Sequence, residues 1–419
     1  MREIAEFRDT ILFSEKQASA MLEGLRGIRP HFFFQHSYSF MADLLRQEIA
    51  TGAHTIVIKI GTRVLTQPDG SLDYNRIVRL GKELNAILDS GRRVVVVSSG
   101  AVGAGMDRLG WSRRPTDLPH LQAVAAIGQS ALVEAYDKSL RVHGRHVAQV
   151  LLTAEDLNRR PSYLNARNTI LTLLELGAVP IINENDTVSV DELRTTFGDN
   201  DRLAGIVTNL LRAPLLILLS DVPGLYDGPP AALNSRVIPL VTGVGTEVLE
   251  LVHDRPNGMS KGGMASKLEA ARLVTAAGEN VIIASGRDHG VLGGILAGET
   301  VGTLVIAQGR SVTSRKRWIG FAAVPKGAIR LDHGASQAVR KGGRSLLPAG
   351  IVEVTGEFEK GDVVSIQDIQ GADFARGLTN YGSSDIRRIK GLKTEQIFEA
   401  LGYHPYDEVV HRDNMVVTN

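Results

Sequence analysis

Several features that many proteins rely on are missing from this chain. It contains no cysteine, which excludes disulfide bonds, thiolate metal sites and cysteine nucleophiles. No apolar run approaches the ~18 residues of a membrane-spanning helix, and the N-terminal stretch MREIAEFRDTILFSEKQ lacks the basic-then-apolar layout of a secretion signal. Neither sign of charge dominates, because 47 Lys and Arg face 46 Asp and Glu, so the overall charge predicts no nucleic-acid or membrane partner. We therefore expect a cytoplasmic globular protein.

Two common nucleotide-binding motifs are also absent. No GxxxxGK[ST] occurs, and SSGAVGAGMDRLG fails the GxGxxG pattern because Arg108 occupies the last position. The 11 histidines are scattered without metal-ligand spacing, so we expect no protein metal site. Any phosphate-binding role must use a different geometry.

From Thr55 onward, short apolar runs alternate with stretches that suit helices. TIVIKI is followed by a predicted helix from Tyr74 to Ser90 and then by RRVVVVSSG, and HVAQVLL, AVPIIN, LLILLSD and NVIIASG repeat the pattern. Continuous apolar strands between amphipathic helices predict a three-layer αβα sandwich with a mostly parallel central sheet. In such sheets ligands bind beyond the carboxyl ends of the strands.

The 419 residues suggest more than one domain. Beyond Gly309 a basic link leads to short, glycine-rich strands such as GIVEVTG and GDVVSI, which predict a small β-rich domain. We expect an N-terminal extension at 1–54, either disordered or helical, with a candidate helix around Ser14 to Leu25. An α/β domain at 55–310, a linker at 311–325, the β-rich domain at 326–405 and a C-terminal tail at 406–419 follow it. Since Met41 is a second candidate start, we expect residues 1–40 to be dispensable for catalysis.

Polar residues gather at the predicted strand ends. The stretch IINENDTVSVDELRTTFGDNDRL, from Ile181 to Leu203, runs from a buried-looking strand into two clusters of acids and amides. Taken alone, such clusters also suit solvated turns. Lys59 lies within an apolar strand, where a lysine must be paired, either with a bound anion or with an internal carboxylate.

Two glycine-rich segments favour anion binding. SSGAVGAG, beginning at Ser98, joins a strand to a helix, whose N-terminus offers free backbone N–H groups, although a tight turn explains it as well. GMSKGGMASKLEAARLV places Lys267 near a helix start, where a solvated surface loop is the alternative. Lysines, anion-binding turns and acids that could hold an ammonium group together suit phosphoryl transfer. A carboxylate acceptor, already ionised at neutral pH, would need no general base.

At these residues the sequence resembles the glutamate 5-kinases, a family of the amino-acid kinase superfamily. The matching stretches between Thr55 and about Ile306 are IKIGTRVL, VVVVSSGAVGAG, AAIGQS, LLT, YLNARNT, VPIINENDTV, GDNDRLA, LLSDVPGLY and GGMASKLEAA. The later segment GASQAVRKGGRSLLPAGIVEVTGEFEKGDVVSI resembles the PUA domain often fused to this kinase.

The resemblance implies ATP-dependent phosphorylation of the γ-carboxylate of L-glutamate, the first step of proline synthesis from glutamate, with Mg²⁺ accompanying ATP. Implied catalytic residues are Lys59 and Lys267, which would neutralise the transferred phosphoryl group, and Asp199 and Asp201, either of which could orient the lysines. The implied glutamate-binding residues are Ser99, Gly100, Ala101, Asp186 and Asn200. The implied ATP-binding residues are Lys59, Ser220, Asp221, Lys261, Gly262, Gly263, Met264, Ala265, Ser266 and Lys267. Lys261 departs from the pattern, since the family usually has a small hydroxyl residue there.

The resemblance further implies a homodimer or homotetramer, and feedback inhibition by proline acting through the loop from Val188 to Gly198. A uridylate, acetylglutamate or carbamate kinase is the nearest alternative, and the pairing of NENDTV with GDND and a PUA tail argues against it. An RNA-binding protein with a degenerate kinase half is a second alternative. Residues 326–402 carry eleven basic and ten acidic side chains, so charge does not support nucleic acid as a partner of the PUA domain.

Overall fold

The computed structural model describes residues 43–188, 200–232, 234–252, 263–307 and 314–418. The chain divides into a unit of residues 1–45 and a unit of residues 46–419. Of the first unit only residues 43–45 are described, and they are helical. The helix expected around Ser14 to Leu25 lies outside the described residues. No described helix is long and apolar enough to cross a membrane.

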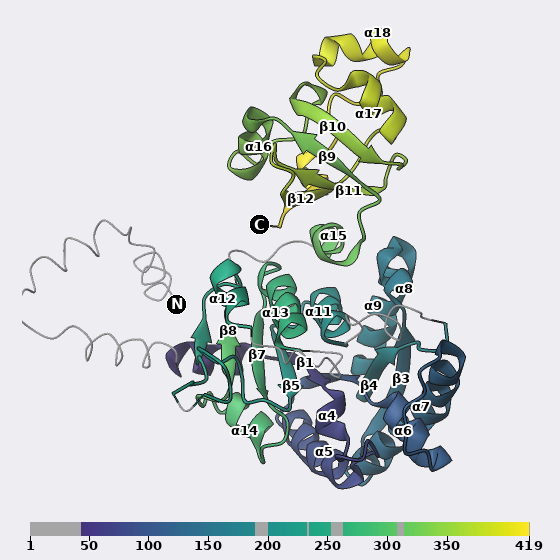
Figure 1. Ribbon diagram of the computed structural model, residues 1–419, viewed down its shortest axis with the longest axis vertical. Helices are drawn as coiled ribbons and strands as arrows, with labels where there is room; N and C mark the ends of the chain where they lie inside the picture. The colour runs from purple at the N-terminus through teal and green to yellow at the C-terminus, as the bar shows by residue number, and fades with distance from the viewer. Residues whose placement is uncertain (1–42, 189–199, 233, 253–262, 308–313, 419) are drawn as a thin grey trace, which may run out of the picture. The chain divides into compact units, whose positions relative to one another are not determined.

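An eight-stranded sheet forms the centre of the α/β domain (Figure 1). Its strand order is β3-β4-β2-β1-β5-β7-β8-β6, and every neighbouring pair is parallel except β7 with β8. The strands are β1 (Thr55–Ile60), β2 (Arg93–Ser98), β3 (His146–Leu152), β4 (Ala178–Glu184), β5 (Leu215–Ser220), β6 (Leu240–Val241), β7 (Asn280–Ser285) and β8 (Thr303–Val305). All six residues of β1 and of β5 are buried, which confirms the mostly parallel sheet predicted from uninterrupted apolar runs.

Helices cover both faces of this sheet, as Figure 1 shows. On one face lie α9 (Arg160–Glu175), α11 (Asn200–Leu211) and α13 (Met264–Thr275), and on the other lie α5 (Tyr74–Asp89), α7 (Leu118–Arg141) and α14 (Val291–Leu296). The remaining helices of the domain are α4 (Thr62–Leu65), α6 (Ala101–Leu109), α8 (Ala154–Asn158) and α12 (Thr246–Glu250). The three layers agree with the predicted sandwich.

Helix α5 illustrates how local sequence sets these elements. Its N-cap Asp73 accepts a hydrogen bond from the backbone N–H of Arg76. Buried side chains recur at Ile77, Leu80, Leu84 and Ile87, the spacing of one helix face. The helix ends at Asp89, one residue before the predicted end.

A second, five-stranded sheet has its own hydrophobic core. Its order is β10-β9-β11-β12-β13, and the strands are β9 (Gly327–Leu331), β10 (Ile351–Gly356), β11 (Val363–Gln367), β12 (Asp373–Leu378) and β13 (Met415–Val417). Its main helices are α16 (His333–Arg340), α17 (Ser383–Ile389) and α18 (Ile397–Leu401). Strand β13 comes from the stretch expected to be a tail, and it pairs with β12. A three-residue strand is too short to give a recognisable alternation in sequence.

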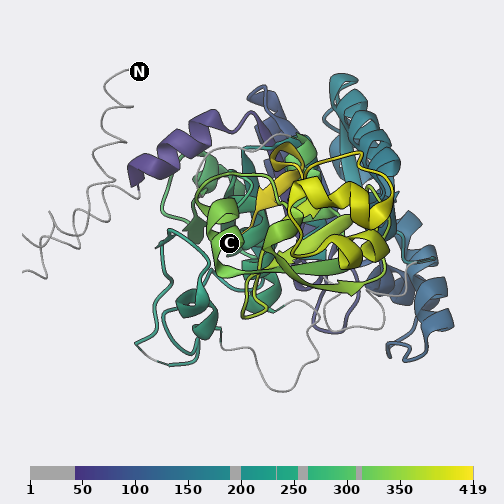
Figure 2. The ribbon, with the colours of Figure 1, turned by 90° about the horizontal axis from the view of Figure 1, so that it is seen from above.

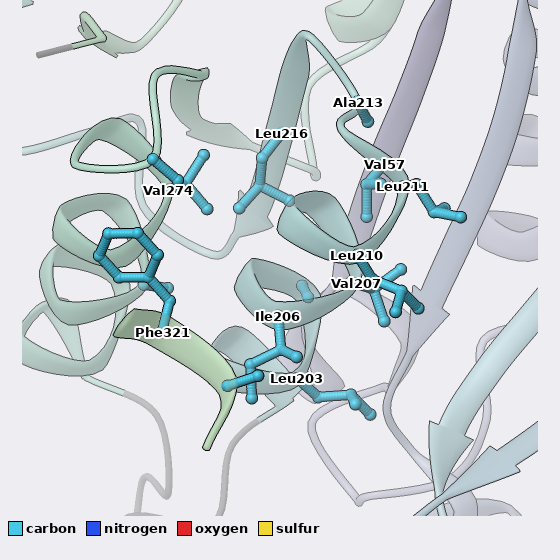
Figure 3. Close-up of a cluster of buried hydrophobic side chains, with 14 of the residues drawn as sticks. Val57, Leu203, Ile206, Val207, Leu210, Leu211, Ala213, Leu216, Val274 and Phe321 are labelled. Atoms are coloured by element: carbon cyan, nitrogen blue, oxygen red, sulfur yellow. The ribbon is translucent and has the colours of Figure 1, made fainter. Parts of the chain in front are cut away.

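The segment expected to be a linker is helical from Ser314 to Ala322. It contains α15 (Ser314–Arg317) and a π-helix η1 (Trp318–Ala322), and its apolar side chains are buried. Trp318 and Phe321 belong to the core that α11 and α13 share with the sheet. Figure 3 shows Phe321 in the same cluster as Ile206 of α11.

Residues 43–52 form a short helix, purple in Figure 2. Arg46, only 2% exposed, donates hydrogen bonds to the carbonyl oxygens of Pro239, Val301 and Gly302 at 2.7, 2.8 and 2.9 Å. Since buried carbonyl groups need donors, this arginine fixes the start of the second unit against the loops beside β6 and β8.

Candidate active site

Two buried lysines meet one carboxylate at the carboxyl ends of the central strands. Lys59 of β1 lies 2.8 Å from Asp201 Oδ1, and Lys267 of α13 lies 3.1 Å from Asp201 Oδ2. The three side chains are at most 4% exposed. Ser266 donates to Asp201 Oδ2 at 2.8 Å. Two ammonium groups held this close to each other favour an anion beside them.

The fold explains why these groups converge. β1 lies between β2 and β5 near the middle of the sheet, so Lys59 stands at its centre. Asp201 is in the first turn of α11, where the helix dipole favours a negative charge. Helices α11 and α13 pack closely, since a Cβ added to Gly205 would lie 3.0 Å from a methyl of Leu273. That close packing brings Lys267, on the first turn of α13, to Asp201.

A chain of buried amides runs from Asn200 across the strand ends. Asn200 Nδ2 donates to Ser98 O at 2.8 Å, to Asn183 Oδ1 at 2.7 Å and, at 3.1 Å, to Ser99 Oγ. Asn183 Nδ2 in turn donates to Gln129 Oε1 at 2.7 Å. Asn200 Oδ1 has no hydrogen-bond partner among the described residues.

A cavity of about 230 Å³ opens beside this chain. It is lined by residues of α7, by the end of β3 and by residues 184–187, and it includes Gln129, Glu184 and Asp186. Its volume is below the ~300 Å³ at which pockets for drug-sized ligands begin. A small molecule with hydrogen-bonding groups suits it.

The SSGAVGAG segment runs from the last residue of β2, through the turn at Ser99 and Gly100, into α6. Gly100 adopts φ 100°, a left-handed conformation that favours glycine, and serves as the N-cap of α6. Helix α7 then crosses α6 so closely that a Cβ on Gly128 would lie 1.8 Å from the carbonyl oxygen of Ala101. Only glycine allows this contact, and it fixes the position of the neighbouring Gln129.

Some of the residues expected to bind nucleotide lie at the carboxyl end of β5, at the same edge of the sheet as Lys59. Ser220 ends β5 and Asp221 follows it, where Asp221 pairs with Arg63 at 3.0 Å. Burial opposes ionisation of Asp221, but its hydrogen bond and charge contact with Arg63 outweigh burial and lower its pKa. Gly263 is the N-cap of α13. The first turn of this helix consists of Met264, Ala265, Ser266 and Lys267.

The structure brings several of the sequence-predicted residues together. Lys59, Lys267, Asp201 and Ser266 are in contact, Ser99 is hydrogen-bonded to Asn200, and Asp186 lines the cavity. Asp199, Lys261, Gly262 and most of the loop from Val188 to Gly198 lie outside the described residues. Two residues were not predicted as site residues, Asn183 and Gln129. The strand-end position pointed to Asn183, whereas only the AAIGQS match pointed to Gln129.

Comparison with known proteins shows the families to which the two domains belong. The model of the amino acid kinase family matches residues 54–285, and the PUA domain model matches residues 327–400. A glutamate 5-kinase from Rhodopirellula baltica is 50% identical over 89% of this chain and 96% of its own length. Glutamate 5-kinases from Moorella thermoacetica and Methylococcus capsulatus are 47% and 44% identical, over 87% and 88% of this chain and 96% and 98% of their own lengths.

Proposed function

This chain belongs to the glutamate 5-kinases of the amino acid kinase family, and from that membership we propose that it transfers the γ-phosphoryl group of ATP to the γ-carboxylate of L-glutamate. The products are ADP and glutamate 5-phosphate, an acyl phosphate that begins proline synthesis from glutamate. The observation that carries the proposal is the contact of Lys59 and Lys267 with Asp201, whose neighbour Asn200 is connected by hydrogen bonds through Asn183 to Gln129 at the cavity.

The lysine pair suits the charge that moves in this reaction. A phosphoryl group in transfer spreads negative charge over its oxygens, and positioned cations stabilise it. Asp201 holds both ammonium groups within 3.1 Å, so they are oriented before substrate arrives. In this role Asp201 is a positioning residue, and Lys59 and Lys267 are catalytic residues.

The acceptor carboxylate does not have to lose a proton before it reacts. The γ-carboxylate of glutamate is ionised at neutral pH, and one of its oxygens forms the new bond to phosphorus as the bond to ADP breaks. The site accordingly needs charge and positioning rather than a histidine base.

The amide chain and cavity suit glutamate. Asn200 Nδ2 is already engaged with protein acceptors, so Asn200 would meet substrate through its Oδ1, as an acceptor for the ammonium group. Asp186, lining the cavity, would accept from the same ammonium group. Ser99 would lie nearer the γ-carboxylate, at the turn formed by Gly100 and Ala101.

ATP would occupy the side of the site formed by Ser220, Asp221 and the first turn of α13. Mg²⁺ is commonly held by substrate phosphates with only one or two carboxylates, and no group of three or more metal-binding side chains exists among the described residues. Its chemistry would be to neutralise charge on the phosphates. Cytoplasmic location, a homodimer or homotetramer and inhibition by proline stay predictions.

A panel of acceptors tests the proposal. Purified protein with MgATP is given L-glutamate, UMP, N-acetylglutamate or carbamate, and ADP release is measured. We expect release with glutamate well above the others. Preference for any other acceptor would refute the proposed substrate, and RNA binding without any ATP turnover would favour the alternative that the sequence left open.

A further inference from the structure

Gln129 is a buried residue of α7 whose side-chain amide is only partly hydrogen-bonded among the described residues. Its side chain is 7% exposed, and it lines the cavity with Glu184 and Asp186. Its Nε2 has no hydrogen-bond partner among the described residues. Leaving two N–H donors buried and unpaired is costly, so this group points to a ligand.

The hydrogen-bond network fixes which end of this amide is left without a partner among the described residues. The carbonyl oxygen of Ser98 can only accept, so the atom of Asn200 beside it must be Nδ2. The backbone N–H of Glu184 can only donate, and it donates to Asn183 Oδ1 at 2.9 Å. Asn183 Nδ2 is therefore the donor to Gln129, and Gln129 must accept through Oε1. The remaining Nε2 is left to donate to a ligand.

The chemistry of the cavity selects the ligand group. A carboxylate is acceptor-only and would pair with the two hydrogens of Nε2. Glu184 and Asp186 on the same cavity repel a carboxylate but attract an ammonium group. An α-amino acid carries both groups, so a cavity with acidic residues and one fixed amide donor matches its two ends.

Building on the proposed function, we propose that Gln129 is a substrate-binding residue whose Nε2 donates to the α-carboxylate of glutamate. Asn200 and Asn183 hold Gln129 in this orientation, and Asn200 is next to Asp201, which holds the lysines. One hydrogen-bonded chain thus connects recognition of the α-carboxylate with the residues that meet the γ-carboxylate. Gln129 would help to select α-amino acids of the right length.

The test exchanges the donor for an acceptor and changes the substrate to match. L-Isoglutamine keeps the γ-carboxylate but has a carboxamide, which can donate, in place of the α-carboxylate. We expect Gln129→Glu to raise the KM for glutamate at least about tenfold while the KM for ATP changes less than about threefold. The preference for glutamate over isoglutamine, as a ratio of kcat/KM values, should fall at least about tenfold. Gln337→Glu, the same change at an exposed position of α16, should leave the preference unchanged.

A second variant covers the case in which the new carboxylate prevents folding. Gln129→Met removes the donors without adding charge, and it should also reduce the preference for glutamate. An active protein whose preference survives substitution of Gln129 would overturn the inference alone. A protein without substitutions that turns over no glutamate would overturn the proposed function, and this inference with it.

Discussion

Replacing Lys267 by methionine removes one of the two ammonium groups at Asp201 with little change in side-chain volume. Asp201 keeps Lys59 at 2.8 Å, so its carboxylate does not lose all compensation and the protein should stay folded. The sum of charge on the three side chains falls from one positive charge to zero. At an effective dielectric constant of about 20, a unit charge about 4 Å from the phosphoryl group contributes about 4 kcal/mol. That corresponds to a loss of about a thousandfold in kcat.

The assay is ADP release at saturating ATP and glutamate, accompanied by thermal unfolding of each variant. Lys82→Met, on an exposed position of α5, is the matched control and should keep normal kcat and stability. A folded Lys267→Met protein with kcat within tenfold of the unsubstituted protein would refute the proposed role of the lysine.

Three further outcomes follow from the geometry. Asp186→Ala should raise the KM for glutamate at least about tenfold and that for ATP less than about threefold; equal increases, measured by steady-state kinetics, would argue against an ammonium contact. Gly128→Ala should destabilise the protein by about 1–3 kcal/mol or prevent folding, because its Cβ would lie 1.8 Å from Ala101 O, whereas Gly293→Ala in α14, with nothing within 4 Å of the new Cβ, should be neutral or slightly stabilising in thermal unfolding. Arg63→Ala should lower the free energy of unfolding at pH 7 by no more than about 1 kcal/mol, because the pair with Asp221 is partly exposed. Since the pKa of Asp221 is lowered in the folded state from its ordinary value of 3.8, this contribution to stability is present above pH 3.8 and is lost as the pH falls through the folded-state pKa. A difference in the free energy of urea unfolding between the Arg63→Ala variant and the unsubstituted protein that stayed constant across that range would contradict it.

The sheet could be predicted from sequence because its strands are buried on both faces. Runs such as TIVIKI and LLILLS are apolar almost throughout and show neither a helical nor an alternating pattern, which is typical of strands buried on both faces. Strand β13 could not be predicted, because its three residues owe their conformation to pairing with β12. The burial of Trp318 and Phe321 could not be predicted either, because they lie in a basic segment and pack on a surface that α11 supplies.

The candidate site was predictable where residues follow strands. Lys59 and the NEND cluster stand at strand ends, where sheet topology alone places ligands. Sequence could not show that Asp201 contacts both lysines, because this contact depends on how α11 begins. Gln129 could not be recognised from sequence as a site residue, because a glutamine within a helix is not unusual. Its place in the site depends on its hydrogen bond with Asn183 and on the close approach of α7 to α6 at Gly128.

The most direct test of the whole account is to trap the product. Protein is incubated with MgATP and L-glutamate in the presence of hydroxylamine, which converts an acyl phosphate into a hydroxamate, and hydroxamate is measured together with ADP. We expect both to form in equal amounts, to require glutamate, and to decrease together in the Lys267→Met variant. ADP release without hydroxamate, or hydroxamate formation that does not depend on Lys267, would contradict transfer to a carboxylate at this site.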